Sequence, residues 1–296
     1  MNWIRRQDKA LKVDPQIATG NRELPLLSVV IPSFNQGQFI ERTILSIISQ
    51  GYPRLELILM DGGSTDATMA IVERYKKHFA HIESEPDGGQ SAAIGKGFEL
   101  ASGEYISWLN SDDTYNEGAL LAVGEFFAQN PQVQFAYGDT WIIDESDRRL
   151  LFKKSVMFFL PVMKYAFLTV PQMSAFWSRK LYHQAGGMDK DLRFCMDYDL
   201  FVRMSEISAP HRISRSIGNF RMHSASKTTN LEDVRQSEDK IVRERYCRVK
   251  PSAGWRFAVV RFAMSIVLIW LMAFGGGLFG RLRDRLFAQL RKLASV

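Results

Sequence analysis

Cysteine is nearly absent from this chain. Its 296 residues include only Cys195 and Cys247, which lie too far apart in the sequence to build a disulfide scaffold or a zinc knuckle. A reducing compartment is therefore expected. Internal repeats and low-complexity segments are also missing, and the chain is 46% hydrophobic and 24% charged. This balance excludes disordered and collagen-like proteins and is typical of a folded chain of one large or two ordinary domains.

Several common nucleotide-binding and catalytic signatures are missing too. The segment Ser33-Phe-Asn-Gln-Gly37 contains a single glycine, so it does not form the Gly-x-Gly-x-x-Gly turn of dinucleotide-binding proteins. There is no Gly-x-x-x-x-Gly-Lys-Ser/Thr phosphate loop, no Gly-x-Ser-x-Gly elbow and no His-Glu-x-x-His motif. These absences argue against a dinucleotide cofactor and against the enzyme classes that use the other three motifs.

The net charge of +6 is unevenly distributed. Residues 235–296 contain 13 Lys/Arg against 4 Asp/Glu, whereas the remainder contains 25 against 28. A mildly acidic body therefore carries a basic tail, and such tails bind nucleic acid or an anionic membrane surface. The first ten residues are charged and have no apolar run, so we expect no signal peptide there.

Short apolar runs alternate with segments of helical periodicity in the first half of the chain. Strands are predicted at 26–31, 55–60, near 82 and at 105–109, with helices at 39–50, 64–79, 91–101 and 117–129. This alternation predicts an α/β fold with a mostly parallel, Rossmann-like sheet and helices on both faces. Ligands of such sheets bind at the carboxyl ends of the strands. Those ends hold Ser33, Asp61, Asp87 and the pair Asp112 and Asp113.

The pair Asp112 and Asp113 directly follows the fourth predicted strand. Two adjacent carboxylates repel each other, and a divalent cation such as Mg²⁺ or Mn²⁺ relieves that repulsion. The alternative is that Asp112 caps the next helix and Asp113 is solvated. At the other strand ends, Asp61 is placed to accept a hydrogen bond from a base imide or a ribose hydroxyl. Asp87 precedes a helix N-terminus able to meet phosphate, although both positions also suit simple turns.

Four motifs occur in a fixed order. They are Val29-Val-Ile-Pro-Ser-Phe-Asn35, Asp61-Gly-Gly-Ser-Thr-Asp66, Gly103-Glu-Tyr-Ile-Ser-Trp-Leu-Asn-Ser-Asp-Asp113 and Met196-Asp-Tyr-Asp-Leu200. Together, over about residues 27–228, they resemble family 2 glycosyltransferases of the GT-A fold. The resemblance implies a nucleotide-sugar donor, a divalent metal and inversion at the anomeric carbon. The Gln-x-x-Arg-Trp motif of processive synthases is missing, which favours transfer of one sugar per encounter.

The resemblance also implies a role for individual residues. Asp197 matches the catalytic base, ahead of Asp199. Asp113 is the implied direct metal ligand, with Asp112 nearer the ribose or sugar and His223 as a late metal or diphosphate contact. The implied donor-binding residues are Pro32, Ser33, Phe34, Asn35, Asp61, Asp87, Gln90, Lys96 and Asp112. Acceptor contacts are expected between about Pro171 and Asp199, including Gln172, Trp177 and Asp199.

Three departures from the family pattern bear on the identity of the donor. Asn110 stands where the metal motif often begins with Asp, and Met196 stands where an acid often precedes the base. The Arg and Asn often found after the third strand are replaced around Ile94-Gly95. Gln90 and Lys96 are therefore the remaining candidates there for contacts with the donor phosphates.

The C-terminal tail contains an uncharged run at 262–280, which has the length of a membrane span. Gly275–Gly277 weaken it as a helix. The leucines of 281–293 form one stripe among cations, as in an interfacial helix. We expect a lead-in at 1–25, the GT-A domain at 26–230, a linker helix at 231–254 and a membrane-associating tail at 255–296. The tail is expected to span the membrane, to re-enter it as a hairpin or to lie on its surface. The alternatives are a hairpin packed on the catalytic domain and a dimer contact.

These patterns and the resemblance predict a metal-dependent, inverting glycosyltransferase that uses Mn²⁺ or Mg²⁺. Its acceptor is expected to be a lipid-linked or surface glycan, and its location the cytoplasmic face of a bacterial inner membrane. Expected partners are the nucleotide-sugar, the acceptor and an anionic membrane surface, with a homo-oligomer through the tail as an open option and no nucleic acid. The alternatives are a sugar-phosphate nucleotidyltransferase and a non-catalytic glycan- or nucleotide-sugar-binding protein.

Overall fold

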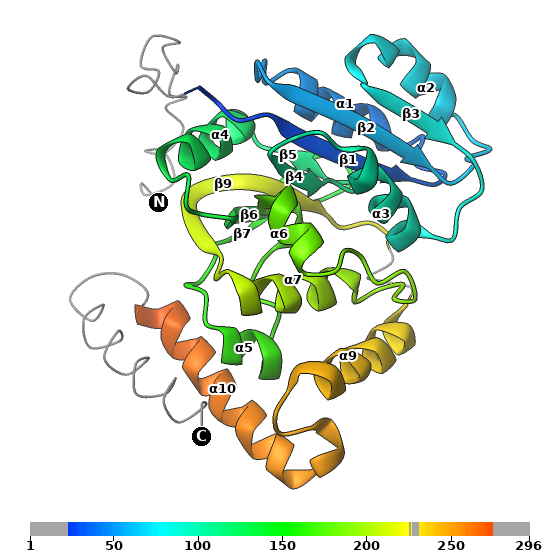
Figure 1. Ribbon diagram of the computed structural model, residues 1–296. Coiled ribbons are helices and arrows are strands. Elements are labelled where there is room, and N and C mark those ends of the chain that lie inside the picture. The colour runs from blue at the N-terminus through cyan, green and yellow to red at the C-terminus, as the bar shows by residue number, and fades with distance from the viewer. Residues whose placement is uncertain (1–22, 225, 227–230, 275–296) are drawn as a thin grey trace, which may run out of the picture.

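The computed structural model describes residues 23–224, 226 and 231–274. In this part of the chain, nine strands form one sheet with the order β3-β2-β1-β4-β8-β6-β9-β5, and β7 pairs with β6 outside that path. Figure 1 shows the strands in the upper half of the molecule and α9 and α10 below them. Residues 1–22 of the predicted lead-in (1–25) and residues 275–296 of the predicted tail (255–296) lie outside the described residues.

The N-terminal half of the sheet is parallel. Strands β1 (Leu27–Ser33), β2 (Leu55–Asp61), β3 (His81–Ser84) and β4 (Tyr105–Trp108) all run in one direction, with β1 between β2 and β4. Every residue of β1 is buried, which explains its apolar sequence. The helices here are α1 (Ile40–Ile48), α2 (Thr68–Arg74), η2 (Lys76–His78), α3 (Gln90–Leu100) and α4 (Ala119–Gln129). The predicted strand–helix alternation is confirmed.

The C-terminal half of the sheet is mixed. Strand β8 (Ala175–Ser178) runs antiparallel to both β4 and β6 (Phe135–Ile143), and β9 (His211–Arg221) runs parallel to β6. The short strand β5 (Thr114–Tyr115) and the hairpin strand β7 (Arg149–Lys153) pair antiparallel with β9 and β6. Intervening helices are α5 (Leu160–Tyr165), η3 (Gln172–Ser174), α6 (Arg179–Gln184) and α7 (Met196–Ile207). The α/β class is as predicted, but the mostly parallel arrangement belongs to the N-terminal half.

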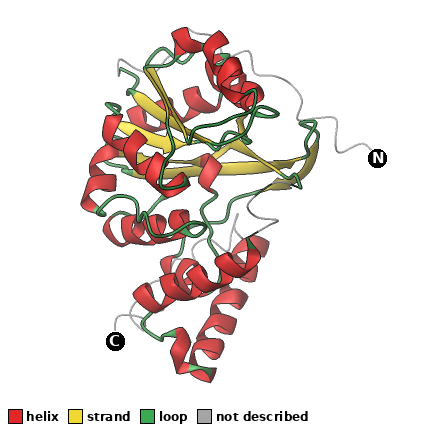
Figure 2. Cartoon of the chain, turned by 90° about the vertical axis from the view of Figure 1, so that its right-hand side faces the viewer, coloured by secondary structure: helices red, strands yellow, loops and turns green. Residues whose placement is uncertain are grey.

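Two apolar clusters cover the two faces of the sheet. Val30 packs in the cluster that includes residues of α3, α6 and α7. Its neighbours Val29 and Ile31 pack in the cluster that includes α1 and α4. Successive strand residues point to opposite faces, so β1 contributes to both layers. Figure 2 shows the helices on both sides of the sheet.

A helical lobe, made of α5, α9 (Glu232–Tyr246), η4 (Pro251–Ala253) and α10 (Trp255–Phe274), lies below the sheet (Figure 2). Met264, Val267 and Leu268 of α10 pack against Phe159 and Val162 beside α5. None of the helices in the described part of the chain is both long and apolar enough to cross a membrane.

Gly97 allows α3 to lie directly on the sheet. A Cβ atom there would be 2.5 Å from Val30 Cγ1 and 3.1 Å from Met60 Cγ. We expect Gly97→Ala to lower the free energy of unfolding by about 1–3 kcal/mol, because the added methyl group would overpack the interface and push α3 away from the sheet. Gly95→Ala is the matched control, since its Cβ would meet Met188 at an ordinary 3.5 Å. Urea denaturation should show the control neutral or slightly stabilised, and equal losses in both variants would contradict this packing.

Candidate active site

A cleft of about 700 Å³ opens at the carboxyl ends of β1 and β4. Its walls come from the end of β1, the turn before α3, the segment after β4, η3 and the start of α7. Segments far apart in the sequence therefore meet there, as expected for a doubly wound sheet. The predicted residues that line it are Pro32, Ser33, Phe34, Asp87, Gln90, Asp112, Gln172 and Asp197.

The loop after β1 is fixed by hydrogen bonds to the loop after β2. Asn35 has a left-handed backbone with φ of 52°. Its N–H donates to Ser64 Oγ at 2.7 Å, and its Oδ1 accepts the Thr65 N–H at 2.9 Å. Asn35 therefore stabilises the loop that forms one wall of the cleft, but it does not line the cleft itself.

The Asp61 carboxylate is hydrogen-bonded to the turn that follows β2 and to the end of β3. Its carboxylate accepts hydrogen bonds from the N–H groups of Gly63 and Ser64 and from the hydroxyls of Ser64 and Ser84, at 2.5–3.2 Å. The residue is only 3% exposed. Asp61, the predicted nucleoside contact, is therefore not among the residues that line the cleft, and its oxygens accept hydrogen bonds from the chain itself.

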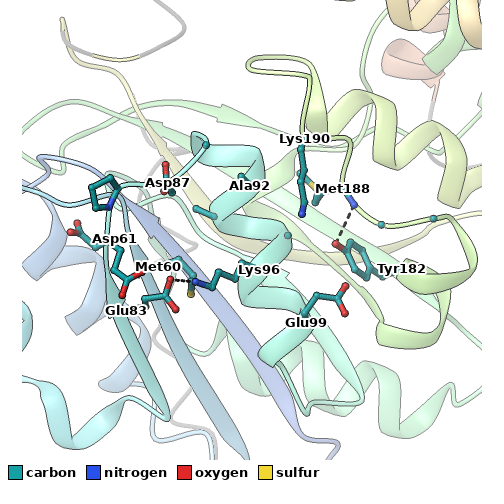
Figure 3. A pocket seen from close by; sticks show the side chains of 17 residues that line it. Met60, Asp61, Glu83, Asp87, Ala92, Lys96, Glu99, Tyr182, Met188 and Lys190 are labelled. Carbon is teal, nitrogen blue, oxygen red and sulfur yellow. Dashed lines mark hydrogen bonds and ion pairs between the residues drawn. The ribbon is translucent and has the colours of Figure 1, made fainter.

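A smaller hollow of about 500 Å³ lies beside the cleft and shares Asp87 with it. Figure 3 shows Asp61 and Lys96 at this hollow, with Lys96 directed at Glu83. The Lys96 ammonium forms an ion pair with Glu83. Lys96 therefore faces the hollow, and the structure does not bring this predicted phosphate contact into the cleft.

Asn110 connects three cleft segments through its side-chain amide. Gln90, the first residue of α3, donates from Nε2 to Asn110 Oδ1 at 2.8 Å. Asn110 Nδ2 in turn lies 3.4 Å from Gln172 Oε1, and Gln172 Nε2 donates to the Trp108 carbonyl at 2.7 Å. The departure from Asp at this position thus places a neutral hydrogen-bonding residue among those that line the cleft.

Asp112 and His223 form a pair at the cleft. Asp112 Oδ2 lies 2.9 Å from His223 Nε2, although the residues are 111 positions apart. The His223 ring also packs on Phe39, with 4.5 Å between ring centroids. The Asp112 side chain is 21% exposed and that of His223 is 2% exposed. The structure thus brings together two of the three predicted metal ligands.

Asp113 is not among the residues that line the cleft. It is 1% exposed, and its Oδ1 accepts the Arg221 N–H at 2.9 Å. Burial, followed by the charge of Asp112, raises the pKa of Asp113 well above its usual range. The buried guanidinium of Arg221 donates to the Asp112 carbonyl at 2.6 Å and to Asp147 Oδ1 at 2.6 Å. Arg221 therefore fixes the Asp112–Asp113 turn, a role that the sequence reasoning missed although Arg221 lies two residues before His223.

Asp112 and His223 fit a divalent cation that is shared with a substrate. Among the described residues, no group of three or more His, Cys, Asp or Glu side chains could hold a metal by itself. Mg²⁺ is commonly held by one or two carboxylates together with substrate phosphates and water, and carboxylate and water ligands also suit Mn²⁺. The Asp112 carboxylate lines the cleft and would meet this requirement when phosphate oxygens supply the remaining ligands, with the buried imidazole of His223 2.9 Å from it.

Asp197 lies in the first turn of α7 and lines the cleft. Its Oδ1 accepts the Tyr198 N–H at 2.7 Å. Burial raises the pKa of Asp197 to about 6. A carboxylate with a pKa near the working pH suits general-base chemistry.

Two predicted acceptor contacts lie away from the cleft. Asp199 is 1% exposed and forms ion pairs with Arg203 at 2.6 Å and Arg245 at 3.2 Å. Trp177 is fully buried, with its ring centroid 5.5 Å from that of Trp108. Both side chains serve internal packing, so Gln172 is the predicted acceptor residue that the structure places at the cleft.

The cleft at the carboxyl ends of the strands combines the Asp112–His223 pair with the carboxylate of Asp197. Residues 28–182 match the family model described as glycosyl transferase family 2. This match covers more than half of the chain, so the chain belongs to glycosyltransferase family 2.

Several known proteins are similar to this chain. It is 36% identical over 110 residues to TuaG of Bacillus subtilis, whose name assigns it to teichuronic acid biosynthesis, and the match spans 36% of this chain and 43% of TuaG. It is 30% identical over 190 residues to the uncharacterized glycosyltransferase Rv1514c of Mycobacterium tuberculosis, covering 63% of this chain and 71% of that protein. The crystal structure of S. aureus TarS 1-349 in complex with UDP-GlcNAc has a TM-score of 0.59 at 14% identity, covering 75% of this chain and 71% of that one.

Proposed function

We propose that this enzyme transfers one sugar per encounter, with inversion, from a nucleotide-sugar to a hydroxyl of a lipid-linked or surface-glycan acceptor, using Mn²⁺ or Mg²⁺. The observation that carries the proposal is the convergence of the Asp112–His223 pair and Asp197 on one cleft. The family match and a structural neighbour solved with UDP-GlcNAc support a nucleotide-sugar donor.

In the proposed reaction, the donor diphosphate lies between Asp112 and the N-terminus of α3, where backbone N–H groups and the helix dipole favour an anion. The acceptor oxygen forms a bond to the anomeric carbon from the opposite side as the bond from that carbon to the diphosphate oxygen breaks. Asp197 takes the hydroxyl proton and later releases it to solvent. Asp112 and His223 would hold a divalent cation, which would supply positive charge to offset the negative charge of the leaving diphosphate.

A panel of nucleotide-sugars tests this function without a known acceptor. We expect slow hydrolysis of one donor, because water can replace the acceptor hydroxyl, and we expect the rate to rise with added Mn²⁺ and fall with EDTA. Release of nucleoside diphosphate can be followed by chromatography. Release of a nucleoside monophosphate and a sugar phosphate, or no turnover and no binding of any donor, would contradict the proposal.

We also propose that α10 attaches the enzyme to the anionic cytoplasmic face of a membrane. One face of α10 packs on α5, and the opposite face forms the α10 stripe, whose residues are 52–75% exposed. The α10 stripe consists of Trp255, Val259, Phe262, Ile266, Ile269 and Met272. Arg256 and Arg261 on the same helix are exposed as well. An apolar stripe with flanking cations suits a helix lying in an anionic lipid surface.

Vesicle flotation tests the α10 stripe. We expect the enzyme to float with vesicles of phosphatidylcholine and phosphatidylglycerol. Partitioning onto the vesicles should fall at least about 100-fold in the triple variant Phe262→Ser, Ile266→Ser, Ile269→Ser, because each of these side chains would bury apolar area in the lipid. The control replaces two exposed leucines on α1 and α3, Leu45 and Leu100, with serine. Equal flotation of all three proteins would contradict the attachment.

A further inference from the structure

Glu238 of α9 lies beneath the segment that leads into α7. The residue is 7% exposed. Its Oε1 accepts the N–H of Arg193 at 2.8 Å, and its Oε2 accepts the N–H groups of Phe194 and Cys195, both at 2.8 Å. Three consecutive backbone donors therefore converge on one buried carboxylate.

The segment held by Glu238 is a wall of the active site. Arg193, Phe194, Met196 and Asp197 all line the cleft, and Asp197 is only two residues beyond the last amide bound by Glu238. Since α7 begins at Met196, the place of its first turn depends on the backbone that enters it.

Further contacts between α9 and α7 make this arrangement rigid. The Tyr246 hydroxyl donates to Asp199 Oδ1 at 2.8 Å. The Arg243 guanidinium lies 5.3 Å from the centre of the Tyr198 ring. In Figure 1, α9 lies beside the chain that enters α7. The first turn of α7, which carries Asp197, is thus fixed from outside by side chains of α9.

The chemistry of the contact requires a carboxylate. Burial of a charged group is costly unless it is hydrogen-bonded, and hydrogen bonds to an ionised acceptor are stronger than neutral ones. A carboxylate offers acceptors only, which matches three N–H donors, whereas the amide group of a glutamine would direct its own N–H groups at some of them.

We propose that Glu238 is a positioning residue for sugar transfer, which fixes the place of Asp197 through the backbone of residues 193–195. This inference rests on the proposed role of Asp197 as the base. It assigns a function in the reaction to α9, which lies outside the region matched by the family model.

Steady-state kinetics of Glu238→Gln test the proposal. We expect kcat to fall by about 10- to 100-fold, because a base displaced by even 1 Å loses much of its effect. The KM for the donor should stay within about twofold, since Pro32, Gln90 and Asp112 are held by other elements. Glu232→Gln is the matched control, because among the described residues this exposed carboxylate of α9 pairs with Arg235 and Gln236 of its own helix. Its kcat should be unchanged.

Hydrogen exchange of the full chain, read by mass spectrometry on peptides covering 190–200, gives a readout that does not depend on activity. Exchange should be faster in Glu238→Gln and unchanged in Glu232→Gln. If the wild type turns over no nucleotide-sugar, the proposed function fails, while the exchange data still report on the Glu238 contact. If the wild type is active, full kcat in Glu238→Gln despite faster exchange overturns the positioning role.

A parallel loss of kcat, donor affinity and thermal stability in Glu238→Gln would show a purely structural role and also overturn the proposal. Glu238→Asp covers the case in which Glu238→Gln does not fold. This variant keeps the acceptor charge but shortens its reach, so we expect partial protection of the amides and a kcat between those of the wild type and a variant without the contact. A folded Glu238→Asp with lost protection and full kcat would overturn the positioning role.

Discussion

Asp197→Asn is expected to lower kcat for sugar transfer or donor hydrolysis by about 10²–10⁴-fold, the usual contribution of a general base. The amide cannot take the acceptor proton, but its size is nearly unchanged, so the nucleotide Kd should stay within about twofold. Enzyme kinetics and calorimetry measure the two quantities. Asp191→Asn, an exposed carboxylate in the segment before α7, is the matched control and should keep full activity. Loss of nucleotide binding together with kcat would show that Asp197 is structural.

The pH profile tests the same residue in the wild type. Burial raises the pKa of Asp197 to about 6, and only the ionised form can act as a base. The rate should therefore be constant well above pH 6 and fall about tenfold for each pH unit below it. The residual rate of Asp197→Asn should lack this dependence, and an identical acidic limb in the variant would assign it to another group.

Asp112→Asn is expected to lower kcat/KM by about 10²–10³-fold, the size of effect seen when one group that stabilises developing charge is removed. It should also abolish the enhancement of nucleoside diphosphate binding by Mn²⁺, because Asp112 and His223 are the metal-fitting side chains that meet at the cleft. Calorimetry with and without Mn²⁺ measures this enhancement. Glu117→Gln, which removes an exposed acid shortly after the motif, is the control.

The variant Asp113→Asn tests whether Asp113, as the family resemblance implies, or Asp112, as the structure favours, is the metal ligand. The resemblance implies Asp113 as the direct ligand, whereas the structure directs its carboxylate at the Arg221 N–H. We expect this variant to be less stable and to retain the response to Mn²⁺. A response lost in Asp113→Asn and kept in Asp112→Asn would contradict the assignment of Asp112.

The parts of the fold that the sequence predicted are those set by local pattern. The apolar runs of β1, β2 and β4 bury both of their faces in a parallel sheet, and such runs are readable without knowledge of the partners. The carboxyl ends of β3 and β4 led directly to Asp87 and Asp112. Asp197 came from the family resemblance, and its place in the cleft agrees with that role.

What the sequence did not predict depends on contacts between distant residues. Arg221 donates to Asp113 across 108 positions, and no local pattern indicates such a pair. Residues 231–254 have the composition of a polar linker, yet Glu238 is buried there because three amides from another segment surround it. A tryptophan such as Trp177 can either pack in the core or stack on a sugar, and the sequence does not distinguish the two. In the structure Trp177 packs on Trp108 in the core.

The most direct measurement of the central claim is a proton NMR spectrum of the sugar first released from the hydrolysed donor, recorded before mutarotation. Attack by water activated at Asp197 predicts the anomer opposite to that of the nucleotide-sugar, formed faster with Mn²⁺ and nearly absent with Asp197→Asn. Release of the retained anomer, or release at the wild-type rate by Asp197→Asn, would contradict a single inverting displacement in this cleft.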